Sequence, residues 1–113
     1  ILLGGTRNDT LTGGVGDDLL NGGDGFDRVV ETGDINFTLS GFTLTGNGTD
    51  NLNSIESVQL SGGAGNNAIN AAGFTVGTVR INGLEGNDTI TGGSQGDLLD
   101  GGKGNDLMDG GDG

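Results

Sequence analysis

Six aspartates recur at a spacing of nine residues in two separate parts of the chain, and they are the side chains best suited to chemistry. Each one follows a glycine-rich segment and precedes three residues of which the middle one is large and apolar. A carboxylate beside exposed backbone carbonyls offers only oxygen ligands, which hard cations such as Ca²⁺ and Mg²⁺ prefer. The spacing therefore predicts repeated cation sites. The aspartates are Asp9, Asp18, Asp27, Asp88, Asp97 and Asp106.

The charge and composition favour a cation as the partner. The 113 residues include sixteen Asp and Glu, four Lys and Arg, no Cys and no His, and the formal net charge is −12. That charge disfavours nucleic acid and anionic membranes as partners, and no apolar run has the length of a membrane span. Without His or Cys, the usual zinc and copper ligands and the Ser–His and Cys–His catalytic pairs are missing. We therefore expect a non-catalytic chain that does not insert into membranes.

The glycine content requires a source of stability other than a large core. Glycine occupies 28 positions, and only 30% of the residues are apolar. Glycine is costly to order on folding, and a glycine-rich chain without a period is typically disordered. Because this chain has a period of nine, we expect it to be ordered when something else stabilises it.

The nine-residue pattern divides the chain into three parts of one continuous solenoid. Residues 1–30 and 83–113 carry regular repeats, and residues 31–82 diverge from the pattern except for a degenerate repeat at 62–70, where Asn67 stands in place of Asp. The sequence begins and ends within a repeat, so we expect it to be a piece of a larger protein.

Each repeat predicts one turn and one short strand. Six mostly glycine residues can form a tight turn, and the next three form a strand whose middle side chain faces the interior. Two repeats then complete a flattened coil of eighteen residues, and coils stack at a strand spacing of roughly 4.8 Å. The predicted interior residues are Leu2, Leu11, Leu20, Val29, Ile69, Ile81, Ile90, Leu99 and Met108.

The divergent middle part has its own alternating apolar pattern. Residues 35–39, 42–44 and 58–60 alternate apolar and polar side chains, which predicts strands. The polar residues 46–54 predict a loop.

The repeats resemble the hemolysin-type calcium-binding repeats, or RTX repeats, of secreted bacterial proteins. The resemblance covers residues 4–30, 62–70 and 83–113. It implies an all-β, right-handed parallel β-roll, a β-solenoid of stacked nonapeptide coils, with Ca²⁺ between the turns. The six aspartates would bind Ca²⁺ through their carboxylates, and backbone carbonyls would complete the sites. The implied carbonyl ligands are those of Gly4, Thr6, Gly23, Gly25, Gly83, Glu85, Gly102, Gly104, Gly92, Ser94 and Gly111.

The resemblance also implies which turns stack. The two best sites would lie between residues 4–9 and 22–27, and between 83–88 and 101–106. Two weaker sites would pair residues 13–18 with 31–36, and 92–97 with the turn that begins at residue 110. Arg7 and Gln95 replace the third glycine of their repeats, so we expect an unfavourable backbone angle at each.

These inferences predict a module that folds when it binds Ca²⁺. The net negative charge opposes folding without the ion, so the chain would stay unfolded in a calcium-poor cytosol. The resemblance implies type I secretion, into the medium or onto the cell surface. The rest of a larger secreted polypeptide would be its covalent partner. Two alternatives remain: an adhesive or surface-layer segment that binds a glycan or cell surface, and an accessory module of a secreted hydrolase or lyase.

Overall fold

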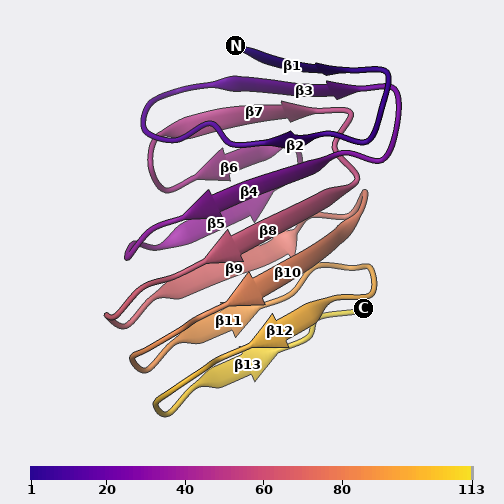
Figure 1. Cartoon of the computed structure of the whole chain (residues 1–113). Helices are drawn as coiled ribbons and strands as arrows, with labels where there is room; N and C mark the ends of the chain where they lie inside the picture. Colours follow the sequence, from indigo (N-terminus) through magenta and orange to yellow (C-terminus); the bar gives the residue numbers. More distant parts are fainter. Residues whose placement is uncertain (113) are drawn as a thin grey trace.

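The computed structural model describes residues 1–112 and consists of flattened coils stacked from the N-terminus to the C-terminus (Figure 1). The coils form two sheets of eight and five strands, called here the long and the short sheet. Within residues 1–112, no helix is long and apolar enough to cross a membrane. The long sheet contains, in spatial order, β1 (Leu2–Gly5), β3 (Leu19–Gly23), β7 (Thr49–Asn53), β6 (Thr43–Thr45), β5 (Phe37–Ser40), β9 (Ala68–Gly73), β11 (Thr89–Thr91) and β13 (Leu107–Asp109). The short sheet contains β12 (Leu98–Asp100), β10 (Thr78–Asn82), β8 (Ser57–Ser61), β4 (Arg28–Thr32) and β2 (Thr10–Leu11).

The strand register confirms the eighteen-residue coil. Leu2 pairs with Leu20 in the long sheet, and Thr10 pairs with Arg28 in the short sheet, each pair eighteen residues apart and parallel. At the other end, Ile90 pairs with Met108 in the same manner. Because side chains alternate across a strand, this register places the middle residue of each strand above its counterpart in the next coil.

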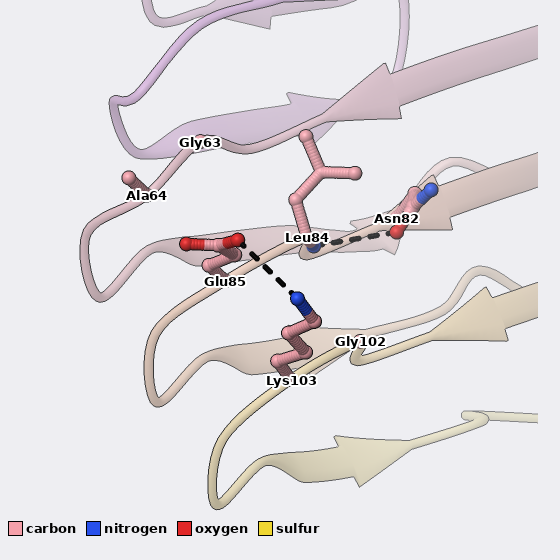
Figure 2. Close-up of a pocket in the computed structure, with 7 residues that line it drawn as sticks. All are labelled: Gly63, Ala64, Asn82, Leu84, Glu85, Gly102 and Lys103. Atoms are coloured by element: carbon pink, nitrogen blue, oxygen red, sulfur yellow. Dashed lines mark hydrogen bonds and ion pairs between the residues drawn. The ribbon is translucent and has the colours of Figure 1, made fainter.

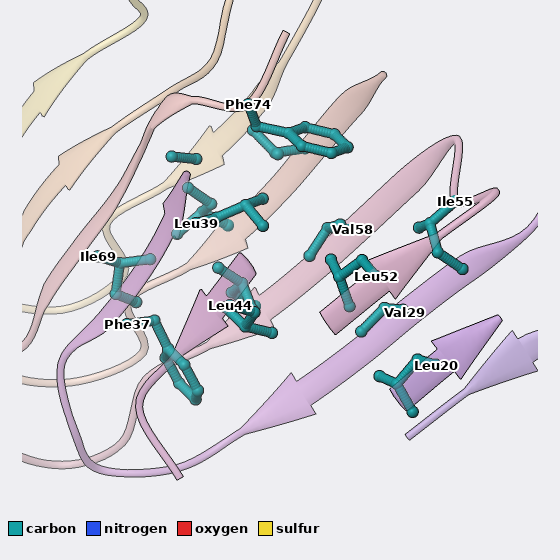
Figure 3. Close-up of a cluster of buried hydrophobic side chains, with 14 of the residues drawn as sticks. Leu20, Val29, Phe37, Leu39, Leu44, Leu52, Ile55, Val58, Ile69 and Phe74 are labelled. Atoms are coloured by element: carbon teal, nitrogen blue, oxygen red, sulfur yellow. The ribbon is translucent and has the colours of Figure 1, made fainter. Parts of the chain in front are cut away.

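The core is a row of single aliphatic residues that widens in the middle of the molecule. Figure 3 shows Leu20 and Val29 near one end of this row, with Phe37, Leu39 and Phe74 filling the wider part. Leu2 and Leu99 are partly buried against the core, whereas Met108 is 50% exposed, so its predicted burial is wrong. The reason is its position on β13, which is an edge strand of the long sheet within residues 1–112 and has a neighbouring strand on one side only. The predicted interior residues that are buried are Leu11, Leu20, Val29, Ile69, Ile81 and Ile90.

A three-stranded insert, β5 to β7, interrupts the regular coils. β6 pairs antiparallel with both β5 and β7, while β7 continues the long sheet in parallel with β3. The predicted loop at residues 46–54 is therefore wrong, since β7 covers Thr49–Asn53. Leu52 and the carboxylate of Asp50 both point inward and are 4% exposed. Only one of the two inward residues of β7 is apolar, so the strand lacks the alternating apolar pattern by which strands are predicted.

The short sheet bypasses the insert. β4 pairs directly with β8 over five residues, although 24 residues separate their nearest ends in the chain (33–56). The turns between the sheets therefore form two columns. The first turn column leads from the long to the short sheet through residues 4–9, 22–27, 54–56, 74–77 and 92–97. The second turn column leads back through residues 13–18, 33–36, 62–67, 83–88 and 101–106.

Candidate metal centre

The two turn pairs expected to form the best sites are stacked as predicted. In the first turn column, the Asp9 amide donates a hydrogen bond of 2.8 Å to Asp27 Oδ1. In the second, the Asp88 amide donates one of 2.8 Å to Asp106 Oδ1. Asp27 and Asp106 thus use Oδ1 to hold the neighbouring turn, and Asp88 Oδ1 accepts the Asn67 amide in the same way. The Oδ2 atoms of these three aspartates and of Asp9 take no part in these bonds.

Three of these remaining oxygens are buried without a partner. Oδ2 of Asp9, Asp27 and Asp88 makes no hydrogen bond, and the side chains of Asp27 and Asp88 are 0% and 1% exposed. The ion pairs found within residues 1–112 lie elsewhere: Lys103 with Glu85, and the N-terminal amine with Asp18. Burying a carboxylate without a counter-charge costs several kcal/mol. A cation beside these oxygens would offset that cost.

The first glycine of each repeat leaves space for such a cation. A side chain at Gly4 would bring its first carbon to 2.8 Å from Asp9 Oδ2 and still closer to the Gly22 carbonyl oxygen. At Gly83, that carbon would meet Asp88 Oδ2 and, at 2.6 Å, the Gly101 carbonyl oxygen. A carboxylate and a carbonyl from adjacent turns therefore face one point, which only glycine keeps open.

The same arrangement recurs near the C-terminus. A first side-chain carbon at Gly92 would lie 2.7 Å from Asp97 Oδ2 and 2.9 Å from the Gly110 carbonyl oxygen. Here, however, Oδ2 accepts a hydrogen bond of 2.8 Å from the Gly93 amide, and the Asp97 side chain is only partly buried. The Asp97 Oδ2 atom therefore has a hydrogen-bond partner without an ion, which the Oδ2 atoms of Asp9 and Asp88 lack.

The carbonyls that converge on these points are additional to the expected set, which stays a prediction. Gly22, Gly101 and Gly110, each the first residue of its repeat, contribute the converging oxygens and were absent from the predicted set. Their common place at position one, opposite the position-six aspartate, is a signal that the repeat pattern contains.

The other glycines and turn residues of the predicted set shape and stack the turns. Glu85 and Ser94 donate their amides to the carbonyls of Gly63 and Phe74 in the preceding coil. Thr6 is exposed. Left-handed backbone, which favours glycine, occurs at the remaining second and fourth positions of the set. These glycines are Gly23, Gly25, Gly102, Gly104 and Gly111.

Two expectations about individual turns are wrong. Within residues 1–112, the only non-glycine residues with positive φ are Ser54 and Leu84, so Arg7 and Gln95 avoid the unfavourable angle. Their turns take another backbone path, in which the glycine conformation is not needed at position four.

The pairing of residues 13–18 with 31–36 is also wrong. Residues 13–18 stack on the β6–β7 hairpin, where the Gly16 amide donates to the Asn47 carbonyl at 2.9 Å and the Asp18 amide to Asp50 Oδ1 at 2.9 Å. The insert occupies the position of the next turn because β7 lies beside β3. Of the expected partner segment 31–36, Glu31 does contact this turn: its Oε1 accepts a hydrogen bond of 2.6 Å from the Gly13 amide.

This turn gathers three carboxylates around Gly13. A first side-chain carbon there would lie 3.1 to 3.3 Å from oxygens of Asp50, Asp18 and Glu31. Burial raises the pKa of Asp50; the hydrogen bond from the Asp18 amide opposes this rise, and the charges of Asp18 and Asp17 add to it. Within residues 1–112, no three acidic side chains are arranged to hold a metal ion by themselves. Because a hard cation such as Ca²⁺ takes six or more oxygen ligands, a site in this turn would also need carbonyl oxygens or water.

The degenerate repeat keeps its stacking without the charge. The Asn67 amide donates to Asp88 Oδ1 at 2.7 Å, as a repeat aspartate would. Its side-chain Oδ1 accepts from the Gly63 amide at 2.9 Å, and its Nδ2 donates to Asp34 Oδ1 at 3.0 Å. Asn67 is thus satisfied where the aspartates are not.

One surface hollow lies away from the unpartnered oxygens of Asp9, Asp27 and Asp88. It has a volume of about 590 Å³ and contains the exposed Glu85–Lys103 ion pair, 3.7 Å long (Figure 2). None of the unpartnered carboxylates lines it, so it is not the metal centre. The lining residues are Gly63, Ala64, Asn82, Leu84, Glu85, Gly102 and Lys103.

The chemistry of the donor set fits calcium. The converging groups are carboxylates and backbone carbonyls, the oxygen ligands from which Ca²⁺ takes six to eight. Residues 1–29, 58–74 and 80–113 match the family model described as RTX calcium-binding nonapeptide repeat, in four copies. No curated protein and no solved structure matches the chain significantly.

Proposed function

The chain belongs to the RTX calcium-binding nonapeptide repeat family, whose repeats bind Ca²⁺ and occur in secreted bacterial proteins, and we propose that it folds on binding Ca²⁺ outside the cell. In this function the module is non-catalytic and supports the secretion and stability of a larger secreted polypeptide. The family match covers more than half of the 113 residues, so calcium is the premise from which the proposal proceeds.

The observation that carries the proposal is the set of buried, unpartnered oxygens at Asp9, Asp27 and Asp88. Bound calcium supplies positive charge at these oxygens. The carbonyls of Gly22 and Gly101 point to the same places as the oxygens of Asp9 and Asp88, respectively, so two stacked turns would share each ion. An ion held in this way links one coil to the next, and its binding free energy becomes part of the folding free energy.

The rest of the chain favours disorder without the ion. A formal net charge of −12 makes the compact state repulsive, and 28 glycines lose much conformational freedom on folding. Sites with few carboxylates and several neutral carbonyls belong to the weak extracellular class, with dissociation constants of roughly 10⁻⁴ to 10⁻³ M. Such affinities leave the chain unfolded in a calcium-poor cytosol and folded outside, which an export route through a narrow channel requires.

Far-UV circular dichroism of the chain tests this proposal. We expect a coil spectrum in chelator and a strand spectrum in roughly 5 mM CaCl₂, above the expected dissociation constants. A control with MgCl₂ at the same concentration separates calcium binding from general charge screening, because Mg²⁺ demands a smaller, octahedral site and dehydrates reluctantly. A strand spectrum in chelator would contradict calcium-coupled folding.

A further inference from the structure

We propose that residues 54–56, which lie outside every repeat, complete a further calcium site with the repeat turn 22–27. The site rests on the proposed function in that it takes the same ion. It differs from the repeat sites because half of it comes from the divergent segment, between the family matches that end at residue 29 and resume at residue 58.

The sheet topology brings the two segments together. β4 pairs with β8 from Arg28 and Ser57 onward, so the residues just before these two strands also lie side by side. The first turn column thus continues directly from residues 22–27 to residues 54–56, although the β5–β7 insert separates them in sequence. In Figure 1 the loop before β8 follows the loop before β4 at the same edge of the molecule.

Glu56 takes the part of a repeat aspartate in this stack. The Asp27 amide donates to Glu56 Oε2 at 2.8 Å, the same contact that the Asp9 amide makes with Asp27 Oδ1. The Glu56 and Ser57 amides return hydrogen bonds of 3.1 and 3.0 Å to the Asp27 carbonyl. The Glu56 carboxylate is therefore fixed against the turn by its backbone as well as by its side chain.

The ligand-binding signal is the free oxygen of Asp27. Oδ2 is buried, has no hydrogen-bond partner and belongs to a side chain that is 0% exposed. It faces the space beside the Gly22 α-carbon, and the Ser54 carbonyl oxygen faces the same space, so that a side chain at Gly22 would collide with both. Ser54 takes the position that the carbonyls of Gly22 and Gly101 hold in the repeat sites.

The backbone of Ser54 explains how so short a loop reaches this position. Ser54 has a φ of 52°, in the left-handed region that residues other than glycine seldom adopt. Left-handed residues reverse the chain within few residues, so residues 54–56 can replace a six-residue turn. The donors that converge on this space are the Asp27 carboxylate and the Ser54 carbonyl, oxygen ligands that a hard divalent cation prefers. The Glu56 carboxylate, held on the Asp27 amide, adds a negative charge next to them.

Calcium titration of the full chain by calorimetry, with bound calcium counted by elemental analysis, tests the site. Glu56→Gln keeps an oxygen that can accept from the Asp27 amide but removes one negative charge. We expect the dissociation constant of one site to rise about tenfold, because the variant removes the Coulomb attraction between Glu56 and the nearby ion. The remaining sites should keep their dissociation constants. Asp24→Asn is the matched control, since it removes the same charge from an exposed position of the same turn. Equal effects of the two variants would overturn the proposal.

A second measurement uses the chain without any substitution, so it does not depend on whether a variant folds. Mn²⁺ added in small amounts to the calcium-loaded chain broadens nuclear magnetic resonance signals near each exchanging site. We expect the signals of Ser54 and Glu56 to broaden together with those of Gly22 and Asp27. Broadening confined to residues of the repeats would overturn the proposal but leave the proposed function intact. A chain that binds no calcium at all would overturn both.

Discussion

Asp88 is a residue at which coil stacking and the proposed calcium binding meet. Its Oδ1 accepts the Asn67 amide and its own amide donates to Asp106, so the residue holds the coils on both sides of it. Its Oδ2 is buried and unpartnered. The same side chain therefore contributes to stacking at all times and opposes folding whenever no cation is present.

Asp88→Asn separates these two effects. Asparagine retains an oxygen for the Asn67 amide but loses the charge that a calcium ion would neutralise. We expect the calcium midpoint of folding to rise about tenfold or more, because the lost attraction acts at contact distance in a buried place. Calcium titrations followed by circular dichroism measure the midpoint. Asp34→Asn, at an exposed carboxylate, should change it about twofold at most. Similar shifts in both variants would show that burial does not mark the ligands.

Asn67→Asp tests the converse change. Asn67 Oδ1 lies beside Gly62, where the Gly83 carbonyl oxygen also points, so the degenerate repeat keeps the geometry of a site. Asn67→Asp would remove the hydrogen bond from Nδ2 to Asp34. It would also place the new carboxylate close to those of Asp34 and Asp88. We expect one additional bound calcium and a less stable fold at low calcium.

Elemental analysis of the dialysed, calcium-loaded variant counts the ions. Asn66→Asp is the control, because Asn66 is exposed and sits one position earlier in the same turn. An unchanged count in Asn67→Asp would mean that a carbonyl and a restored carboxylate do not suffice.

At the scale of strands and turns, the repeat pattern correctly predicts those strands in which a single apolar residue faces the interior. The eighteen-residue register and the buried Leu20, Val29 and Ile90 follow from one apolar residue in each repeat. β7 could not be predicted in this way, because one of its two inward residues is Asp50. The stacking of residues 13–18 was missed for the same reason: the partner turn belongs to a strand that its sequence conceals.

The turns themselves depend on glycine at the positions where coils touch. Gly104 has a φ of 120°, and a side chain there would collide with the Gly86 carbonyl oxygen of the stacked turn. Gly104→Ala should therefore lower the free energy of unfolding in calcium by about 1–3 kcal/mol, since both strain and contact oppose it. At Gly96 an added Cβ would meet no heavy atom within 4 Å apart from the adjacent residues, and φ is not positive, so Gly96→Ala should stay within about 0.5 kcal/mol. Urea unfolding in saturating calcium measures both, and equal losses would contradict the assigned stacking.

At the scale of the whole molecule, the apolar core stabilises the middle coils more than the end coils. Phe37, Leu39, Leu44 and Phe74 give the middle coils an apolar interior. In the C-terminal coil the corresponding residues are Leu99, which is only partly buried, and Met108, which is 50% exposed. Leu107, beside Met108, is 68% exposed. Such end coils bury little apolar surface, so their order must come from stacking and from ions more than from the core. Because acidic turns occur in both columns, we expect bound ions along the stack rather than at one place.

The most direct test is a crystal structure of the calcium-loaded chain with anomalous data for calcium. The account predicts anomalous density at about 2.3–2.6 Å from Oδ2 of Asp9, Asp27 and Asp88, with carbonyl oxygens of the adjacent turns around each ion. Density absent at all three oxygens, with water or an amide in its place, would contradict the claim that calcium neutralises the buried carboxylates of this fold.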